Sequence, residues 1–221
     1  MGTIADWLVA VGTMVLAVVA IFQDSIRGWF YLPKFRVSIK TESPDCGMIA
    51  MTTADGRFIA NTVHLRLWVE NVGNVTAKNA EVFASELRRK RTEGKWERVT
   101  TFMPMNLVWS HIGKPYFPSI ASKMGKHCDL AHISDPARRG MLNEDVPALK
   151  LTNEECALVF KLIVIPNDKA HIVGPGEYQL DILIAAENVG PVKRTVSILV
   201  RGPWDADGAR MLRDHVGVSV A

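Results

Sequence analysis

An apolar stretch at the start of the chain places the strongest constraint on its fold. The stretch runs from Ile4 to Phe22 and contains one charged side chain. A helix of this length, at about 1.5 Å per residue, extends roughly 28 Å, close to the hydrocarbon thickness of a bilayer. Residues 1–32 are therefore predicted to form a transmembrane helix with its interfacial segment. The expected membrane-interface anchors are Trp7, Arg27, Trp29 and Tyr31.

Two other interpretations of this stretch stay open. A cleaved signal peptide normally begins with Lys or Arg, and residues 1–6 contain neither, although Val18-Val19-Ala20 is a weak cleavage site. A buried core helix seldom runs this long without polar residues. The mean hydropathy of the whole chain is slightly positive, and the stretch explains most of that excess.

Basic residues after the span set its expected orientation. Arg27, Lys34, Arg36 and Lys40 follow the apolar stretch, whereas the short N-terminus has no basic side chain. The positive-inside rule then puts the N-terminus outside and the C-terminal part in the cytoplasm, with the chain in the inner membrane as a single-pass protein. Three cysteines, an odd number, fit a reducing compartment.

One side of the predicted span carries small or acidic residues at alternating spacings of four and three. Small residues let helices approach closely in lipid, and an acidic group there needs a partner or water. The pattern predicts self-association of the span, with a water-filled pore as a further possibility. The alternative is that alanine is simply common in bacterial spans and both acids lie among the headgroups. The residues of this association face are Asp6, Ala10, Thr13, Ala17, Ala20 and Asp24.

After Pro33 the hydrophobic period changes from helical to alternating, which is typical of half-buried strands. About seven such segments occur, separated by turns rich in Gly, Pro and Asn and with no amphipathic helix between them. Residues 33–221 are therefore predicted to be a mainly β domain, an antiparallel β-sandwich. The expected strands are 35–40, 63–69, 80–87, 95–99, 157–165, 178–185 and 192–200.

Several motifs carry a resemblance. The segment Leu67 to Phe83 is similar to the strand–turn–strand of bacterial Ig-like domains, and Gly174 to Leu180 to the entry of a late strand, where Tyr178 would take a tyrosine-corner role. With Cys128 to Ile133 and the Gly202-Pro203-Trp204 ending, the chain resembles an uncharacterised family of bacterial single-pass proteins with a cytoplasmic Ig-like sandwich. This resemblance implies architecture only, because the fold hosts many functions.

Two segments depart from the alternating pattern. Residues 103–151 are rich in proline and aromatic residues, and we expect an ordered insertion packed on the sandwich. The tail from Trp204 to His215 is predicted to contain a short helix that starts near Asp205 or Asp207.

The densest group of chemically capable residues is His127-Cys128-Asp129-x-x-His132, with His111 upstream. Nitrogen, sulfur and carboxylate groups at this spacing can bind zinc, but structural zinc sites usually present two clean pairs. A buried cysteine with surface or capping His and Asp is the favoured interpretation. His127 and Cys128 point to opposite sides of a strand, and no phosphate-binding or nucleophile motif occurs. We therefore expect no catalytic residues, no metal and no cofactor.

A basic run at a predicted hairpin is the other candidate contact site. It contains Arg88, Arg89, Lys90 and Arg91. Such a tip suits anionic lipid headgroups, nucleic acid or an acidic partner; the alternative is a solvated edge whose charges block aggregation. The formal net charge of +3 is too small by itself to indicate nucleic acid.

These observations favour a membrane-anchored cytoplasmic interaction or sensor module that binds a protein partner or ligand at the inner membrane. Its other expected partners are the lipid bilayer and a second copy of the span. The alternative is an oligomerising transmembrane effector that perturbs the membrane, as in bacterial immunity. A metal-dependent enzyme is the third and least supported hypothesis.

Overall fold

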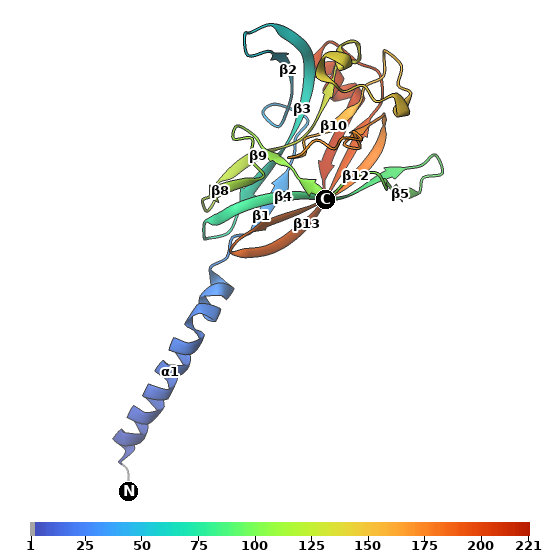
Figure 1. The fold of residues 1–221 in the computed structure, drawn as a ribbon. Coiled ribbons are helices and arrows are strands. Elements are labelled where there is room, and N and C mark those ends of the chain that lie inside the picture. The colour runs from blue at the N-terminus through green and yellow to red at the C-terminus, as the bar shows by residue number, and fades with distance from the viewer. Residues whose placement is uncertain (1–2) are drawn as a thin grey trace.

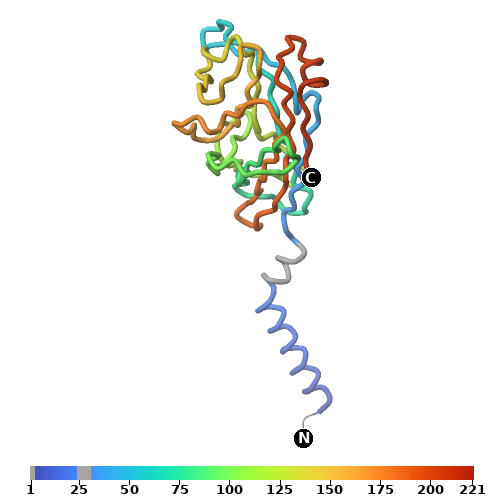
Figure 2. Tube along the Cα trace, turned by 90° about the vertical axis from the view of Figure 1, so that its right-hand side faces the viewer, coloured from blue at the N-terminus to red at the C-terminus, as the bar shows by residue number. Residues whose placement is uncertain are grey.

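The protein consists of one long helix followed by a β domain (Figure 1). The structure, a computed structural model, describes residues 3–221, without the side chains of residues 24–30. Helix α1 spans Ile4–Phe30 and extends away from the domain in both ribbon and tube views (Figures 1 and 2). Its portion Ile4–Gln23 is long and apolar enough to cross a membrane, and none of it is buried. A helix inside the domain core is thereby excluded.

Two antiparallel sheets make up the domain, as predicted. The first sheet contains β1 (Phe35–Ser38), β2 (Cys46–Thr52), β3 (Phe58–Asn71), β7 (Val108–Trp109), β9 (Gly125–Ser134), β10 (Leu158–Phe160) and β11 (Ile172–Val173), in the order β1-β3-β9-β10-β11, with β2 on β3 and β7 on β9. The second sheet contains β4 (Ala77–Lys90), β5 (Trp96–Arg98), β6 (Met105–Asn106), β8 (Tyr116–Ile120), β12 (Gly176–Ala186), β13 (Val189–Val200) and β14 (Val216–Val220), in the order β14-β13-β12-β4-β5, with β6 and β8 on β4.

Strict alternation along β3 explains why the sheets pack face to face. Val63, Leu65 and Leu67 are fully buried, and between them His64 and Arg66 point to the opposite side of the sheet. The buried side chains join those of the second sheet in one continuous core. Each fully buried aliphatic side chain contributes about 1.5–3 kcal/mol, so the core is built from this alternation.

The end of β3 holds the segment that leads from the helix. The Asn71 side chain is fully buried and accepts hydrogen bonds from the backbone N–H groups of Lys34 (3.2 Å) and Gly73 (3.1 Å). Its amide donates to the carbonyl oxygens of Val75 (2.7 Å) and Ile120 (3.0 Å). One side chain therefore ties together the incoming segment, the turn after β3 and the end of β8.

Glycine is required at position 73 by a close backbone approach. A Cβ atom there would lie 2.3 Å from the carbonyl oxygen of Leu32 and 2.6 Å from the backbone nitrogen of Lys34. Any larger residue would push the incoming segment off the domain.

The structure corrects two of the strand assignments. The segment expected as a strand over 157–165 forms only β10, and Ile163 to Ile165 continue as an exposed loop. The segment 103–151 is not a single insertion, because residues 105–134 supply β6, β7, β8 and the central strand β9. Strands β6, β7 and β8 are short, and all four pair with strands that are distant in sequence. Strands β2, β11 and β14 were also not predicted.

The predictions that rested on a few neighbouring residues agree with the structure. The hairpin of β4 and β5 forms as expected, with Gly94 at a φ of 79° in its turn. Asp207 caps the short helix α2 (Gly208–Arg210), which continues as a π-helical turn (Met211–His215). The Tyr178 hydroxyl donates to the carbonyl oxygen of Gly174 at 2.8 Å. Two 3-10 helices, η1 (Pro136–Leu142) and η2 (Pro147–Leu149), complete the elements.

The substitution Asn71→Ala tests the buried amide. It removes four hydrogen bonds and leaves buried backbone groups unpaired, so we expect the free energy of unfolding to fall by about 3 kcal/mol and the melting temperature by roughly 6–12 °C. Urea and thermal unfolding of the detergent-solubilised chain measure both. The matched control is Asn167→Ala, at an exposed loop position, which should change stability by no more than about 0.5 kcal/mol. Equal effects of the two substitutions would contradict the role of Asn71.

Candidate functional site

The outer side of the first sheet carries a row of polar residues in register. His64 on β3 pairs with His132 on β9, which pairs in turn with Val159 on β10. The rings of His64 and His132 stack with centroids 5.8 Å apart. These residues point away from the main core because their neighbours in sequence point into it.

Residues 135–157, which include η1 and η2, form a cover segment over part of this side. A second, small apolar cluster joins the cover to the sheet. On the sheet it contains Val159 and Ile172, and on the cover Val146, Leu149 and Leu151. The cover segment buries polar side chains that the alternation of β9 would otherwise expose to water.

Glu144 of the cover segment is the buried acid of this region. One of its carboxylate oxygens lies 2.6 Å from Nε2 of His132, and the other accepts a hydrogen bond from the Ser134 hydroxyl. Burial alone would raise the pKa of Glu144. The hydrogen bonds from His132 and Ser134, together with the charge of Lys161, outweigh it and hold the pKa below its usual value. The cover is therefore attached to β9 by an ionised carboxylate.

Three histidines in this region are held neutral. Burial, and then the charges of His132 and Lys161, lower the pKa of His64 to about 4. Burial also lowers the pKa of His132, against the opposing effect of Glu144, and that of His171. Neutral imidazoles let the Nε2–H of His132 donate to Glu144 without adding positive charge.

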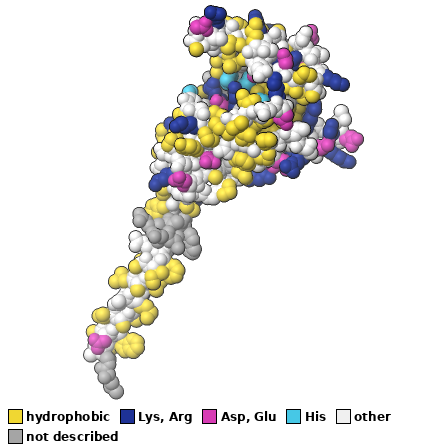
Figure 3. Space-filling view, in the orientation of Figure 1, with side chains coloured by type: hydrophobic (Ala, Val, Ile, Leu, Met, Phe, Trp, Pro, Cys, Tyr) yellow, Lys and Arg dark blue, Asp and Glu magenta, His cyan; other side chains and the backbone are white. Residues whose placement is uncertain are grey.

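A cleft of about 340 Å³ opens where the cover segment meets β10 and the loop after it. Figure 3 shows histidine side chains gathered in a hollow of the domain half that is distal to α1, with cationic and apolar side chains around them. A cavity of this size suits a small molecule. The lining comprises Met51, His132, Leu142, Asn143, Glu144, Val159, Phe160, Lys161, Leu162, Ile165, Lys169, His171 and Ile172.

Two lysines give the cleft a positive charge. The Lys169 ammonium donates to neutral acceptors, which are the carbonyl oxygen and Oδ1 of Asn143 and the carbonyl oxygen of Asp145. Lys161 is half-buried, and within the described chain no hydrogen bond or ion pair holds its ammonium. Its charge nevertheless acts on Glu144 and on all three histidines. Against these two cations the cleft contains one carboxylate, that of Glu144.

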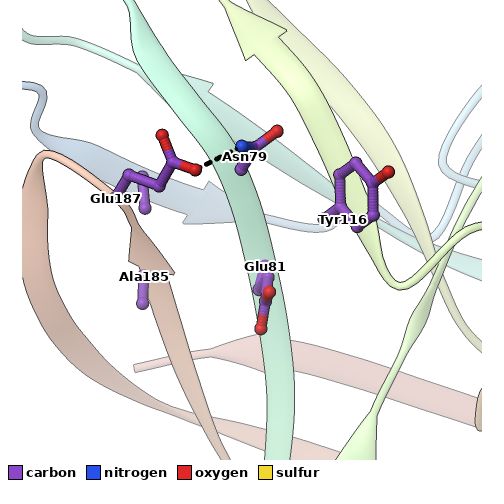
Figure 4. Close-up of a pocket in the computed structure, with 6 residues that line it drawn as sticks. Asn79, Glu81, Tyr116, Ala185 and Glu187 are labelled. Atoms are coloured by element: carbon purple, nitrogen blue, oxygen red, sulfur yellow. Dashed lines mark hydrogen bonds between the residues drawn. The ribbon is translucent and has the colours of Figure 1, made fainter.

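Two other hollows are wider and less suited to recognition. The first, of about 430 Å³, lies beside the turn of β12 and β13 and is lined by Glu81 and Tyr116 (Figure 4). The Asn79 side chain in its wall already donates a hydrogen bond to Glu187. The second, of about 810 Å³, lies between β2 and the C-terminal helix and has mostly small and apolar walls. Neither hollow is lined by a histidine or a lysine.

The residues considered for metal binding separate onto the two sides of β9. His127 contacts Asp45 (2.9 Å), and Asp129 accepts a hydrogen bond from Ser110 (2.6 Å). Cys128 points into the core, where burial raises the pKa of its thiol well above the usual value. His111 is exposed in a turn. Among the residues that the structure describes, no three His, Cys, Asp or Glu side chains converge as metal ligands.

The predicted basic cluster lies at the hairpin of β4 and β5, and each of its members has an acceptor within the domain. Arg88 pairs with Asp181 at 2.7 Å, a carboxylate that Lys193 also contacts. The remaining pairs are Arg89 with the carbonyl oxygen of Pro175, Lys90 with Glu177, and Arg91 with Glu97. Local pairing lowers the charge available to a lipid surface, which favours the solvated-edge interpretation.

The predicted association face lies along the exposed helix α1. Asp6 accepts hydrogen bonds from the backbone N–H (2.7 Å) and the hydroxyl (2.9 Å) of Thr3, so it caps the first turn. Ala10, Thr13, Ala17 and Ala20 are exposed, as are the anchors Trp7 and Tyr31. Asp24, Arg27 and Trp29 lie outside the described side chains. Self-association of the span stays a prediction.

Sequence reasoning missed most of the cleft. His132 was considered only as a metal ligand, and His64, Glu144, Lys161 and His171 were not considered. Lys161 did leave a signal, because it is the single charge in an otherwise apolar strand-like segment, Ala157 to Ile165. Glu144 left none, since its partners are found only once the cover segment folds back on β9.

No protein-family model matches this chain, and no curated protein sequence matches it.

The three neutral histidines predict how stability depends on pH. Below about pH 6.5 the unfolded chain binds protons at these histidines that the folded chain does not, so the free energy of unfolding falls as pH decreases. Below about pH 4.5, protonation of Glu144 adds to the loss. In the variant His64→Gln, the free energy of unfolding should change less steeply with pH between pH 6.5 and 4.5. Unfolding then takes up as much as one proton fewer, which lowers the slope by up to about 1.4 kcal/mol per pH unit.

Urea unfolding of the detergent-solubilised chain at a series of pH values measures this slope. The control is His111→Asn, which removes an exposed imidazole and should leave the slope of the parent unchanged. Indistinguishable slopes for the parent and His64→Gln would contradict the burial of a neutral histidine at position 64.

Proposed function

We propose that this protein is a single-pass, membrane-anchored sensor module whose cytoplasmic β domain binds a ligand in the histidine and lysine cleft. The cleft carries the proposal, because it combines a volume of about 340 Å³, buried ionisable side chains and a cation without a partner within the described chain. Such a combination is the usual mark of a binding site rather than of a structural core. The anchor and the Ig-like sandwich then serve to hold this cleft at the inner membrane.

The short connection between helix and domain supports an anchoring role. Helix α1 ends at Phe30 and β1 begins at Phe35, so residues 31–34 span at most about 14 Å. Asn71 and Gly73 bind this segment to the end of β3. A domain tied so closely to a span stays beside the membrane surface.

The position of the cleft supports a ligand taken from solution. The hollow lies in the half of the domain distal to α1 (Figure 3), so with α1 in the bilayer it lies away from the lipid. Three unpaired, buried cysteines are compatible with the reducing cytoplasm.

The same span would also serve an oligomerising effector. That alternative needs a polar group within the association face that seeks a partner, and Asp6 is already engaged by Thr3 at the first turn. The contact favours the sensor over the effector, and self-association of the span is compatible with both.

Reporter fusions at Ala221 test anchoring and orientation in bacterial cells. We expect a C-terminal green fluorescent protein to fluoresce and a C-terminal alkaline phosphatase to be inactive, because the basic residues after the span stay in the cytoplasm. The fused chain should remain in the membrane at full length. A chain shortened by roughly twenty residues would instead support the signal peptide, and an active phosphatase would contradict the orientation.

Charge variants give this test its control. Lys34→Glu with Lys40→Glu and Thr3→Lys reduces the excess of Lys and Arg after the span from four to one, and a measurable fraction of the phosphatase fusion should become active. Lys114→Glu with Lys150→Glu changes the net charge by a similar amount far from the span in sequence and should have no such effect.

A further inference from the structure

We propose that the ligand of the cleft is a small, water-soluble organic anion, a carboxylate or phosphate monoester attached to an apolar group. This inference rests on the proposed ligand-binding function and adds the chemical class of the ligand. Its basis is the balance of charge and the type of wall within the cleft.

The charge of the cleft is the first argument. Lys161 and Lys169 both line it, and Glu144 is the single carboxylate among its lining residues. Both oxygens of Glu144 are already engaged, by His132 and by Ser134. Because the three histidines of the region are neutral, a net positive charge remains without a partner.

The position of Lys161 is the second argument. It follows Val159 on the outer side of the sheet, between the buried residues Phe160 and Leu162. Lys161 as a residue is half-buried, and within the described chain its ammonium has neither a hydrogen-bond partner nor an ion-pair partner. Its charge acts on His64, His132, His171 and Glu144 alike, and Lys161 lines the cleft together with His132, Glu144 and His171. An anionic ligand in the cleft would give the Lys161 ammonium the ion-pair partner that it lacks within the described chain.

The histidines supply the third argument. His132 is 2% exposed and His171 is 5% exposed, and both line the cleft. The Nδ1 atom of each is buried and has no hydrogen-bond partner within the described chain. Buried polar atoms are normally paired. The Nδ1 of His132 is an acceptor, because its Nε2–H donates to Glu144, so it cannot donate to an anion. In the tautomer that carries the proton on Nδ1, His171 can donate a hydrogen bond to an anion in the cleft.

The remaining wall is apolar and reaches the surface. Met51 and Leu142 line the cleft, and Ile165 at its rim is 70% exposed. Val164, beside it, is also exposed. An apolar group joined to the anion would cover these side chains, whereas inorganic phosphate would leave them in water. The ligand class therefore has both an anionic and an apolar part.

Binding of phenylacetate and phenyl phosphate to the full-length chain in nanodiscs tests the inference. Benzyl alcohol is the neutral probe of similar size. At the efficiency of ordinary small ligands, about ten heavy atoms give a dissociation constant on the order of millimolar, within reach of ligand-observed NMR. We expect at least one of the two anions to bind and benzyl alcohol to bind at least about tenfold more weakly, since it makes no charge-assisted hydrogen bond.

Two lysine variants locate the binding. Lys161→Met keeps an apolar stem and removes the charge, and should weaken anion binding by about tenfold or more. Its free energy of unfolding should fall by no more than about 1 kcal/mol, because the ammonium makes no hydrogen bond and acts on Glu144 only through its charge. Lys114→Met removes the same charge from an exposed loop and should bind as the parent does.

The outcomes separate the two proposals. Equal binding of anions by the parent and Lys161→Met would overturn the inference. Equal affinity for benzyl alcohol and the anions, with resonance shifts at His132 and His171, would also overturn it while leaving the ligand-binding function in place. Binding of none of the three probes would overturn both the ligand class and the function of this cleft. Membrane orientation is measured separately by the reporter fusions and does not depend on any of these results.

Discussion

The alternation of side chains along β3 is the constraint on which the rest of the structure depends. Its inward residues, such as Leu65 and Leu67, build the core that joins the two sheets. Its outward residue His64 begins the polar row that leads to the cleft. Its last residue, Asn71, holds the segment arriving from α1. A shift of one residue in the register of this strand would exchange core and cleft, so fold, site and anchor share one pairing pattern.

The cleft exists because a cover segment turns an exposed sheet side into a partly buried one. Apolar contacts between Leu149, Val159 and Ile172 supply the packing, and the buried carboxylate of Glu144 fixes where the cover joins β9. Burial then lowers the pKa values of the histidines. Polar groups held in such an environment reduce stability unless they are paired, and natural proteins keep them mainly where function requires them.

The candidate membrane span and the proposed binding cleft lie apart in the molecule. The connection of residues 31–34 keeps the domain close to the end of α1, whereas the histidine hollow lies in the distal half. The basic hairpin, the most conspicuous charged feature of the sequence, is neutralised by partners such as Asp181 and Glu177. Within the described chain Lys161, a single lysine in an apolar segment, has no such partner and lines the cleft. The number of basic residues in a sequence segment therefore did not indicate which ammonium or guanidinium group lacks a partner in the folded domain.

The sequence by itself determined the long apolar helix, the mainly β character of the domain, the hairpin of β4 and β5 and the cap at Asp207, because periodicity, turn residues and caps act over a few neighbouring residues. Only the tertiary structure decided that β9 is a central strand and that β10 ends at Phe160, since strand pairing depends on partners distant in the chain. The cleft likewise depends on residues that are distant in the chain. Glu144 and His132 are twelve residues apart, and Lys161 and His171 join them from the two ends of the loop between β10 and β11. Their burial and pKa shifts arise only when these segments pack together.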